Sequence, residues 1–126
     1  MDKLIDAIKK SSLGPSEKDD SSGIRNDFCF DNSFIGFSGH FPGYPILPAV
    51  AQLLVAQLVI EDQMEHKIQV TSIEKAKFLS EVKPNEKITV ECIDNPKDGN
   101  PRSKVRITSG DRPVSSFNIC YCLGGE

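Results

Sequence analysis

The chain has 126 residues, enough for one domain with its own core, and its 38% hydrophobic and 26% charged content is typical of a globular protein. A net charge of −3 without any basic cluster argues against nucleic-acid binding. No segment is long and apolar enough to be a membrane span, and the first twelve residues lack the apolar core of a secretory signal.

The four cysteines, Cys29, Cys92, Cys120 and Cys122, form no C-x-x-C pair and show no metal-ligand spacing. Without an export signal, we expect them to be reduced, buried thiols of a cytoplasmic protein that holds no metal and needs no cofactor.

The first part of the chain predicts little regular structure. Helical spacing of Leu4, Ile5 and Ile8 indicates a short amphipathic helix within residues 2–10, and residues 11–23 are a polar loop that we expect to be mobile. The phenylalanines between residues 28 and 37 favour one or two strands with a turn at 31–32.

A proline-rich stretch at residues 39–48, G-H-F-P-G-Y-P-I-L-P, precedes a strongly apolar segment. Proline excludes a helix interior or a central strand, so this stretch predicts a stiff extended loop, with Pro48 as the first helical residue. Only Gln52 and Gln57 are polar between residues 49 and 60. The apolar character on every side indicates a buried helix that ends within residues 63–66.

After this helix the period changes to two. The pattern predicts strands at residues 68–78, 88–93, 103–109 and 117–123, joined by turns, the first of them long and bent or bulged. The short connections favour an antiparallel meander. The sequence therefore predicts one α+β domain over residues 1–126, a curved antiparallel sheet wrapped around one central helix.

The motif His40-Phe41-Pro42-Gly43-Tyr44-Pro45-Ile46-Leu47-Pro48-Ala49 resembles the signature H-F-P-G-x-P-x-x-P-G of the hotdog-fold 3-hydroxyacyl-[acyl-carrier-protein] dehydratases. Residues 73–91 resemble a strand pair of that family, so the likeness covers about residues 34–91. It implies the hotdog fold, at least a homodimer, and an acyl thioester of acyl carrier protein or coenzyme A as substrate.

The resemblance also implies site residues. His40 would remove the proton next to the thioester carbonyl, and the N–H of Ala49 at the helix N terminus would polarise that carbonyl. Phe41, Gly43, Tyr44 and Leu54 would contact the substrate, with Ile46 and Leu47 among the walls of an apolar tunnel. From its own chemistry, Gln52 either donates a hydrogen bond to the substrate or is a satisfied polar group of the buried helix.

Position 54 departs from the family, because Leu54 stands where the family has the carboxylic acid that protonates the leaving hydroxyl. Glu61 lies about 10 Å further along the helix, too far to replace that acid. Three functions remain open: a dehydratase-like enzyme, a thioesterase or isomerase that uses His40 alone, and a catalytically silent acyl-thioester binding or partner subunit.

Overall fold

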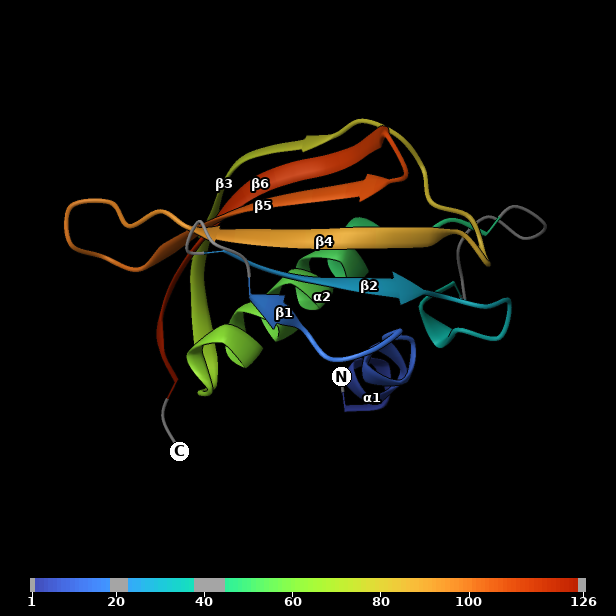
Figure 1. Ribbon diagram of the computed structural model, residues 1–126, viewed down its shortest axis with the longest axis horizontal. Coiled ribbons are helices and arrows are strands. Elements are labelled where there is room, and N and C mark those ends of the chain that lie inside the picture. Colours follow the sequence, from blue (N-terminus) through green and yellow to red (C-terminus); the bar gives the residue numbers. More distant parts are fainter. Residues whose placement is uncertain (1, 19–22, 38–44, 125–126) are drawn as a thin grey trace.

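The computed structural model describes residues 2–18, 23–37 and 45–124. One six-stranded sheet in the order β1-β2-β4-β5-β6-β3 carries the long helix α2 on one face (Figure 1). The helices are α1 (Asp2–Lys10), the 3₁₀ turn η1 (Ile35–Phe37) and α2 (Ala49–Met64). The strands are β1 (Glu17–Lys18), β2 (Gly23–Cys29), β3 (Ile68–Phe78), β4 (Lys87–Asp94), β5 (Arg102–Ser109) and β6 (Arg112–Leu123).

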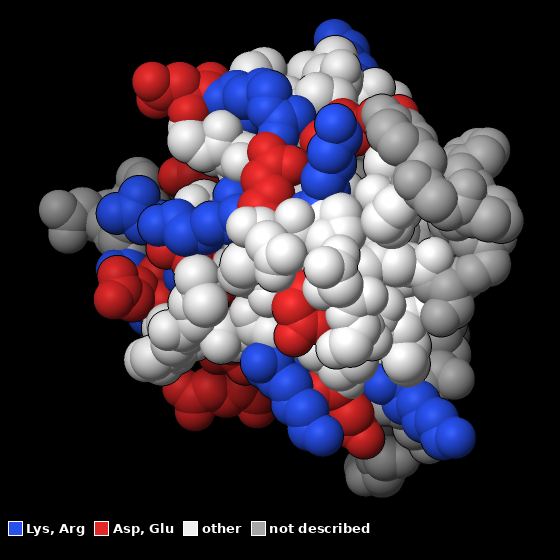
Figure 2. Space-filling model, turned by 90° about the vertical axis from the view of Figure 1, so that its right-hand side faces the viewer, with Lys and Arg blue, Asp and Glu red and all other residues white. Residues whose placement is uncertain are grey.

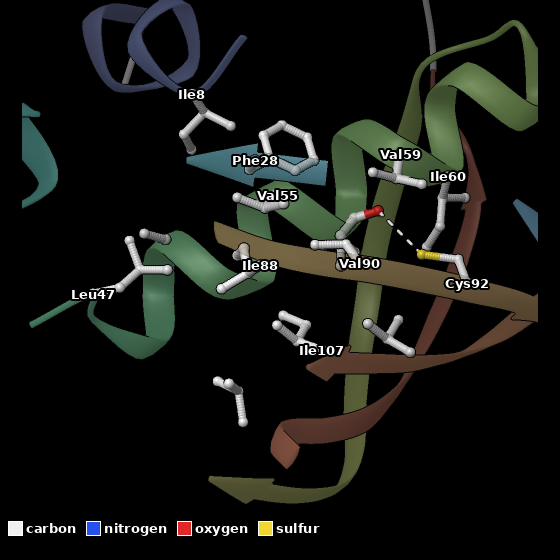
Figure 3. Packing of buried hydrophobic residues seen from close by; sticks show 14 of the residues in the cluster. Ile8, Phe28, Leu47, Val55, Val59, Ile60, Ile88, Val90, Cys92 and Ile107 are labelled. Carbon is white, nitrogen blue, oxygen red and sulfur yellow. Dashed lines mark hydrogen bonds between the residues drawn. The ribbon is translucent and has the colours of Figure 1, made fainter. Parts of the chain in front are cut away.

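The core lies between α2 and the concave face of the sheet. Val55, Val59 and Ile60 of α2 pack toward Ile88 and Val90 of β4, and all are at most 1% exposed (Figure 3). Each fully buried aliphatic side chain of this kind contributes about 1.5–3 kcal/mol. This layer is the wrapped sheet and central helix that the sequence predicts.

Helix α2 has clear ends. Pro48 occupies the N-cap with an extended backbone (φ −72°, ψ 159°), one residue before the position expected for it, and it provides no side-chain cap. At the other end Glu65 adopts the left-handed conformation (φ 53°) and donates its N–H to the Glu61 carbonyl. The Glu61 carboxylate accepts the Ile68 N–H at 3.0 Å, so this acid fixes the turn into β3.

Two N-terminal expectations are corrected. Residues 34–37 form no second strand, because the Asp31 carboxylate accepts both the N–H and the hydroxyl of Ser33 and folds the chain into a turn that continues as η1. These hydrogen bonds hold the pKa of Asp31 below its ordinary value. The segment 11–18 is ordered in part, because β1 pairs with β2 and the Leu13 N–H bonds to the Asp27 carbonyl.

The meander is also shorter than expected. Strands β4, β5 and β6 follow one another as hairpins, but β3 pairs with β6 at the far edge and not with β4. The two strands within residues 73–91, which resemble a strand pair of the dehydratase family, therefore belong to one sheet without pairing with each other. The expected irregularity of the first strand is confirmed by register shifts between Val70 and Ser72 and between Glu74 and Lys77.

The cysteines differ in burial. Cys92 is fully buried against the Ala56 carbonyl, and burial raises the pKa of its thiol far above the usual range (Figure 3). Cys29 and Cys120 are half-buried and Cys122 is exposed, so the expectation of buried thiols is wrong for these three. For Cys120 and Cys122 the reason is their place on the outer face of β6, opposite the buried Phe117, Ile119 and Tyr121.

Candidate functional site at the N terminus of helix α2

The proline-rich motif leads into α2, and the structure describes only its last part. His40, Phe41, Gly43 and Tyr44 lie outside the described residues. The described part begins at Pro45, and the buried Leu47 anchors it to the core (Figure 3). The Leu47 N–H donates to the Val82 carbonyl at 2.8 Å, which ties the motif to the connection between β3 and β4.

The first turn of α2 presents free backbone donors. No described residue accepts a hydrogen bond from the N–H of Ala49 or Val50, whereas the N–H groups of Ala51 and Gln52 both donate to the Pro48 carbonyl. Ala49 is exposed and Val50 is 49% exposed. An uncapped helix N terminus carries partial positive charge, so it favours an oxygen that gains negative charge.

A buried amide holds this turn in place. Gln52 is 4% exposed, its Nε2 donates to the Leu47 carbonyl at 3.3 Å, and its Oε1 accepts the Ser115 hydroxyl at 2.7 Å. Leu47 is thus held from both sides, by Val82 and by Gln52. The sequence did not single out Ser115, although its position two residues before Phe117 places it on the inward face of that strand.

This arrangement predicts a stability effect. Gln52→Leu should lower the free energy of unfolding by about 1–3 kcal/mol, because it leaves the Leu47 carbonyl and the Ser115 hydroxyl buried without their partner. Urea denaturation measures the loss. Gln57→Leu is the matched control: Gln57 is only half-buried and its bond to the Ile68 carbonyl is long at 3.4 Å, so water can replace it. Equal losses in both variants would contradict a specific role of Gln52.

Leu54 lies on the face of α2 that the sheet does not cover. Val50, Leu53, Leu54 and Leu58 are all partly exposed, while the buried positions of the helix alternate with them on the opposite face. Leu54 is partly buried and packs against the core, and its side chain carries no acidic proton. Glu61 belongs to the other end of α2, where it binds Ile68.

A hollow of about 180 Å³ lies against the same helix. It lies between Leu58, Val59 and Asp62 of α2 and residues of α1, the following loop and β2, which are Lys9, Ser12, Gly14, Pro15, Ser16, Asn26 and Phe28. Leu58 is one turn beyond Leu54. The apolar tunnel expected beside His40 stays a prediction, because much of its expected lining lies outside the described residues.

Three further features concern His66, metal binding and membrane spans. His66 is exposed, and its Nδ1 lies 2.6 Å from the Lys67 carbonyl. The described part of the chain holds no group of three or more His, Cys, Asp and Glu side chains that could bind a metal ion. None of its helices has the length and apolar character needed to cross a membrane.

The comparison with known families decides what this chain is. The ApeI-like family, described as ApeI dehydratase, matches residues 16–118. The chain belongs to the ApeI-like dehydratase family. The match includes the described helix N terminus, Gln52 and Ser115, so the site lies within the family's own region.

Curated relatives agree with this family. The chain is similar to the 3-hydroxyacyl-[acyl-carrier-protein] dehydratase FabZ of Koribacter versatilis, with 44% identity over 63 residues. The alignment covers 44% of this chain and 40% of the relative, so the chain spans about two fifths of the length of this curated dehydratase.

Solved structures confirm the hotdog fold. One neighbour is the dehydratase heterocomplex ApeI:P from Xenorhabdus doucetiae, with a TM-score of 0.72, 22% identity, and 88% of this chain and 96% of that chain covered. Another is a hypothetical thioesterase from Streptococcus pneumoniae with coenzyme A, with a TM-score of 0.70, 11% identity, and 100% and 98% covered. The predicted α+β class, a curved antiparallel sheet around one helix, is confirmed.

Proposed function

We propose that the chain, as one domain over residues 1–126, is a subunit of a dehydratase-like lyase that acts on 3-hydroxyacyl thioesters. Membership of the ApeI-like family is the observation that carries this proposal. The free N–H groups of Ala49 and Val50 support it, since they offer donors for the oxygen of a thioester carbonyl that becomes enolate-like.

The chemistry follows from the residues of the motif. His40 takes a proton from the carbon next to the carbonyl, and the N–H of Ala49 stabilises the oxygen that gains charge. Phe41, Gly43, Tyr44, Gln52 and Leu54 border the acyl group. For Gln52 the contact is restricted to its second Nε2 hydrogen, because its carbonyl oxygen and its other N–H serve Ser115 and Leu47.

The leaving hydroxyl lacks a proton donor at position 54, so we expect slow turnover by this chain alone. The experiment is to follow enoyl absorbance with a short 3-hydroxyacyl thioester, presented once on acyl carrier protein and once on coenzyme A. Turnover on either carrier that disappears in His40→Ala supports the proposal. Absence of turnover on both, with a folded protein, favours the silent partner subunit.

A second candidate function is suggested by Leu54 and by the ApeI:P structure, which is a dehydratase heterocomplex. In this form the chain provides His40 and a different chain provides the acid. Turnover that appears only after a second dehydratase chain is added would distinguish it from the first candidate. A thioesterase or isomerase would be recognised by release of free thiol or by a shifted double bond.

We also propose that the chain forms a homodimer in the cytoplasm. Strand β3 is an edge strand with one side unpaired in the described sheet, and Phe78 and Leu79 at its end are 46% and 59% exposed. The partly exposed apolar residues of α2 likewise need a cover. A second copy paired along β3 would remove the exposed edge and bury both sets of residues.

The dimer predicts a specific disruption. Val50→Asp should convert the protein from a dimer to a monomer in light scattering at micromolar concentration, since a charge is costly in an apolar interface. Aspartate in the first turn of a helix is favourable, so α2 itself should not lose stability. Leu13→Asp is the matched control, because Leu13 is 57% exposed far from α2's N terminus in sequence and should leave the dimer intact. A wild-type monomer would contradict the proposal.

A further inference from the structure

The outer face of the sheet, turned away from α2, carries a trough along β6. On this face Ser116 of β6 lies between Lys77 of β3 and Arg106 of β5, and two residues along Asn118 lies between Glu74 and Lys104. The next step places Cys120 between Ser72 and Arg102. The floor is therefore made of short side chains. Lys77 and Glu74 of β3 flank it on one side, and Arg102, Lys104 and Arg106 of β5 flank it on the other, about 9–10 Å away across two strand spacings.

This register produces a real hollow. Its volume is about 310 Å³, and the residues that line it include Lys75, Lys77, Arg102, Lys104, Ser116 and Asn118. A second hollow of about 400 Å³ continues from Arg102 toward Cys120 and Cys122. Both lie on the sheet face that the core does not use, so they are separate from the helix N terminus described above.

The trough is basic in a protein whose net charge is −3. Arg102 is 3.7 Å from Glu74, and Arg106 is 3.7 Å from Glu91. In the described residues no carboxylate forms an ion pair with Lys75, Lys77 or Lys104. By contrast, Figure 2 shows acidic and basic side chains intermingled on the end of the molecule that it faces. Positive charge is therefore concentrated over β3, β5 and β6.

We propose that this trough is a binding site for a phosphorylated small molecule, with its phosphate on Ser116 and Asn118. Lysine ammonium groups attract phosphate as point charges, and a hydroxyl and an amide can donate hydrogen bonds to its oxygens. Lys77 on β3 and Lys104 on β5 lie on opposite walls, offset by two residues along β6, so both line the hollow above Ser116 and Asn118. The adjoining hollow at Arg102 has room for the group that carries the phosphate. The site does not depend on the proposed dehydratase activity.

The test is a titration of the full chain with inorganic phosphate and with adenosine 3′,5′-bisphosphate, followed by amide chemical shifts. At constant ionic strength the Ser116 and Asn118 signals should move and saturate, whereas chloride should have no such effect. Tighter binding of the bisphosphate would identify a nucleotide-like ligand, and equal binding would identify phosphate itself. Both results support the site.

Variants locate the binding. Lys77→Gln with Lys104→Gln should weaken phosphate binding about tenfold or more, since each change removes a charged hydrogen-bond donor. The matched control Lys3→Gln with Lys10→Gln removes the same charge from exposed positions of α1 and should change affinity less than twofold. Asn118→Asp, which places a negative charge on the floor, should abolish binding without touching a lysine.

Three results would overturn the proposal. The first is a set of shifts spread over many lysines without saturation, and the second is an equal loss in the α1 control, since either shows non-specific attraction. The third is displacement of phosphate by a polyglutamate peptide that binds more tightly, because the trough would then be a docking surface for an acidic protein.

Discussion

Leu54→Glu should raise the dehydration of a short 3-hydroxyacyl thioester by about tenfold or more. A positioned general acid typically contributes about 10²–10⁴-fold, and this variant puts a carboxyl group at the position where the dehydratase signature has its acid. Burial of the apolar face of α2 around Leu54 in the proposed dimer should raise the pKa of the new carboxyl. A fraction of it then stays protonated near neutral pH, as a proton donor requires.

The same variant predicts a pH profile. The ratio of the variant's rate to the wild-type rate at the same pH should be largest at low pH. It should fall as pH rises through the raised pKa of the glutamate, because only the protonated carboxyl donates a proton. Burial of an unpaired acid in the proposed dimer should also cost about 1–3 kcal/mol of stability. Both effects are measurable in one preparation, by enoyl absorbance and by urea denaturation.

Two controls separate acid catalysis from a change of shape. Leu54→Gln has nearly the same size as the glutamate and hydrogen-bonding ability but no acidic proton, so it should give no gain. His40→Ala in the Leu54→Glu chain should abolish the gain, because the base would be missing. Rapid turnover by the wild type, or a folded Leu54→Glu dimer without any gain, would show that the proton donor lies elsewhere.

Phe30→Ala should lower the free energy of unfolding by about 3–5 kcal/mol, a large part of the about 5–15 kcal/mol available to a domain. Phe30 is fully buried, its ring lies 4.5 Å from that of Phe34, and its carbonyl accepts the Asn85 N–H. Phe34 in turn makes an edge contact with Phe37 at 5.4 Å. This aromatic cluster supports the end of the described segment before the H-F-P-G motif.

Chemical denaturation measures the effect, with two comparisons. Phe30→Leu keeps most of the apolar volume and should cost distinctly less. Phe78→Ala removes a ring of the same size from a position that is 46% exposed, and it should cost less still in the monomer. A loss below about 1 kcal/mol for Phe30→Ala would contradict this prediction, because the core would then have repacked into the space left by the ring.

Local patterns in the sequence determined much of this protein. The bounds of α1 and the presence of the long helix after Pro48 and of four strands follow from hydrophobic periodicity. The pattern predicts the last strand at residues 117–123, whereas β6 begins five residues earlier, at Arg112. The H-F-P-G motif indicated the dehydratase family that the comparison then showed. These features depend on neighbours within a few residues, which is the range over which a sequence pattern carries information.

Only the tertiary structure decided which strands meet and which polar groups bind. The sequence could not place β3 beside β6, because strand pairing is settled by which arrangement buries the most apolar surface, a property of the whole chain. It likewise could not show that the Gln52 amide joins Leu47 to Ser115, which is 63 positions further along the chain. The basic trough has the same origin: Lys77 and Arg106 are distant in sequence and flank Ser116 only because β6 lies between their strands.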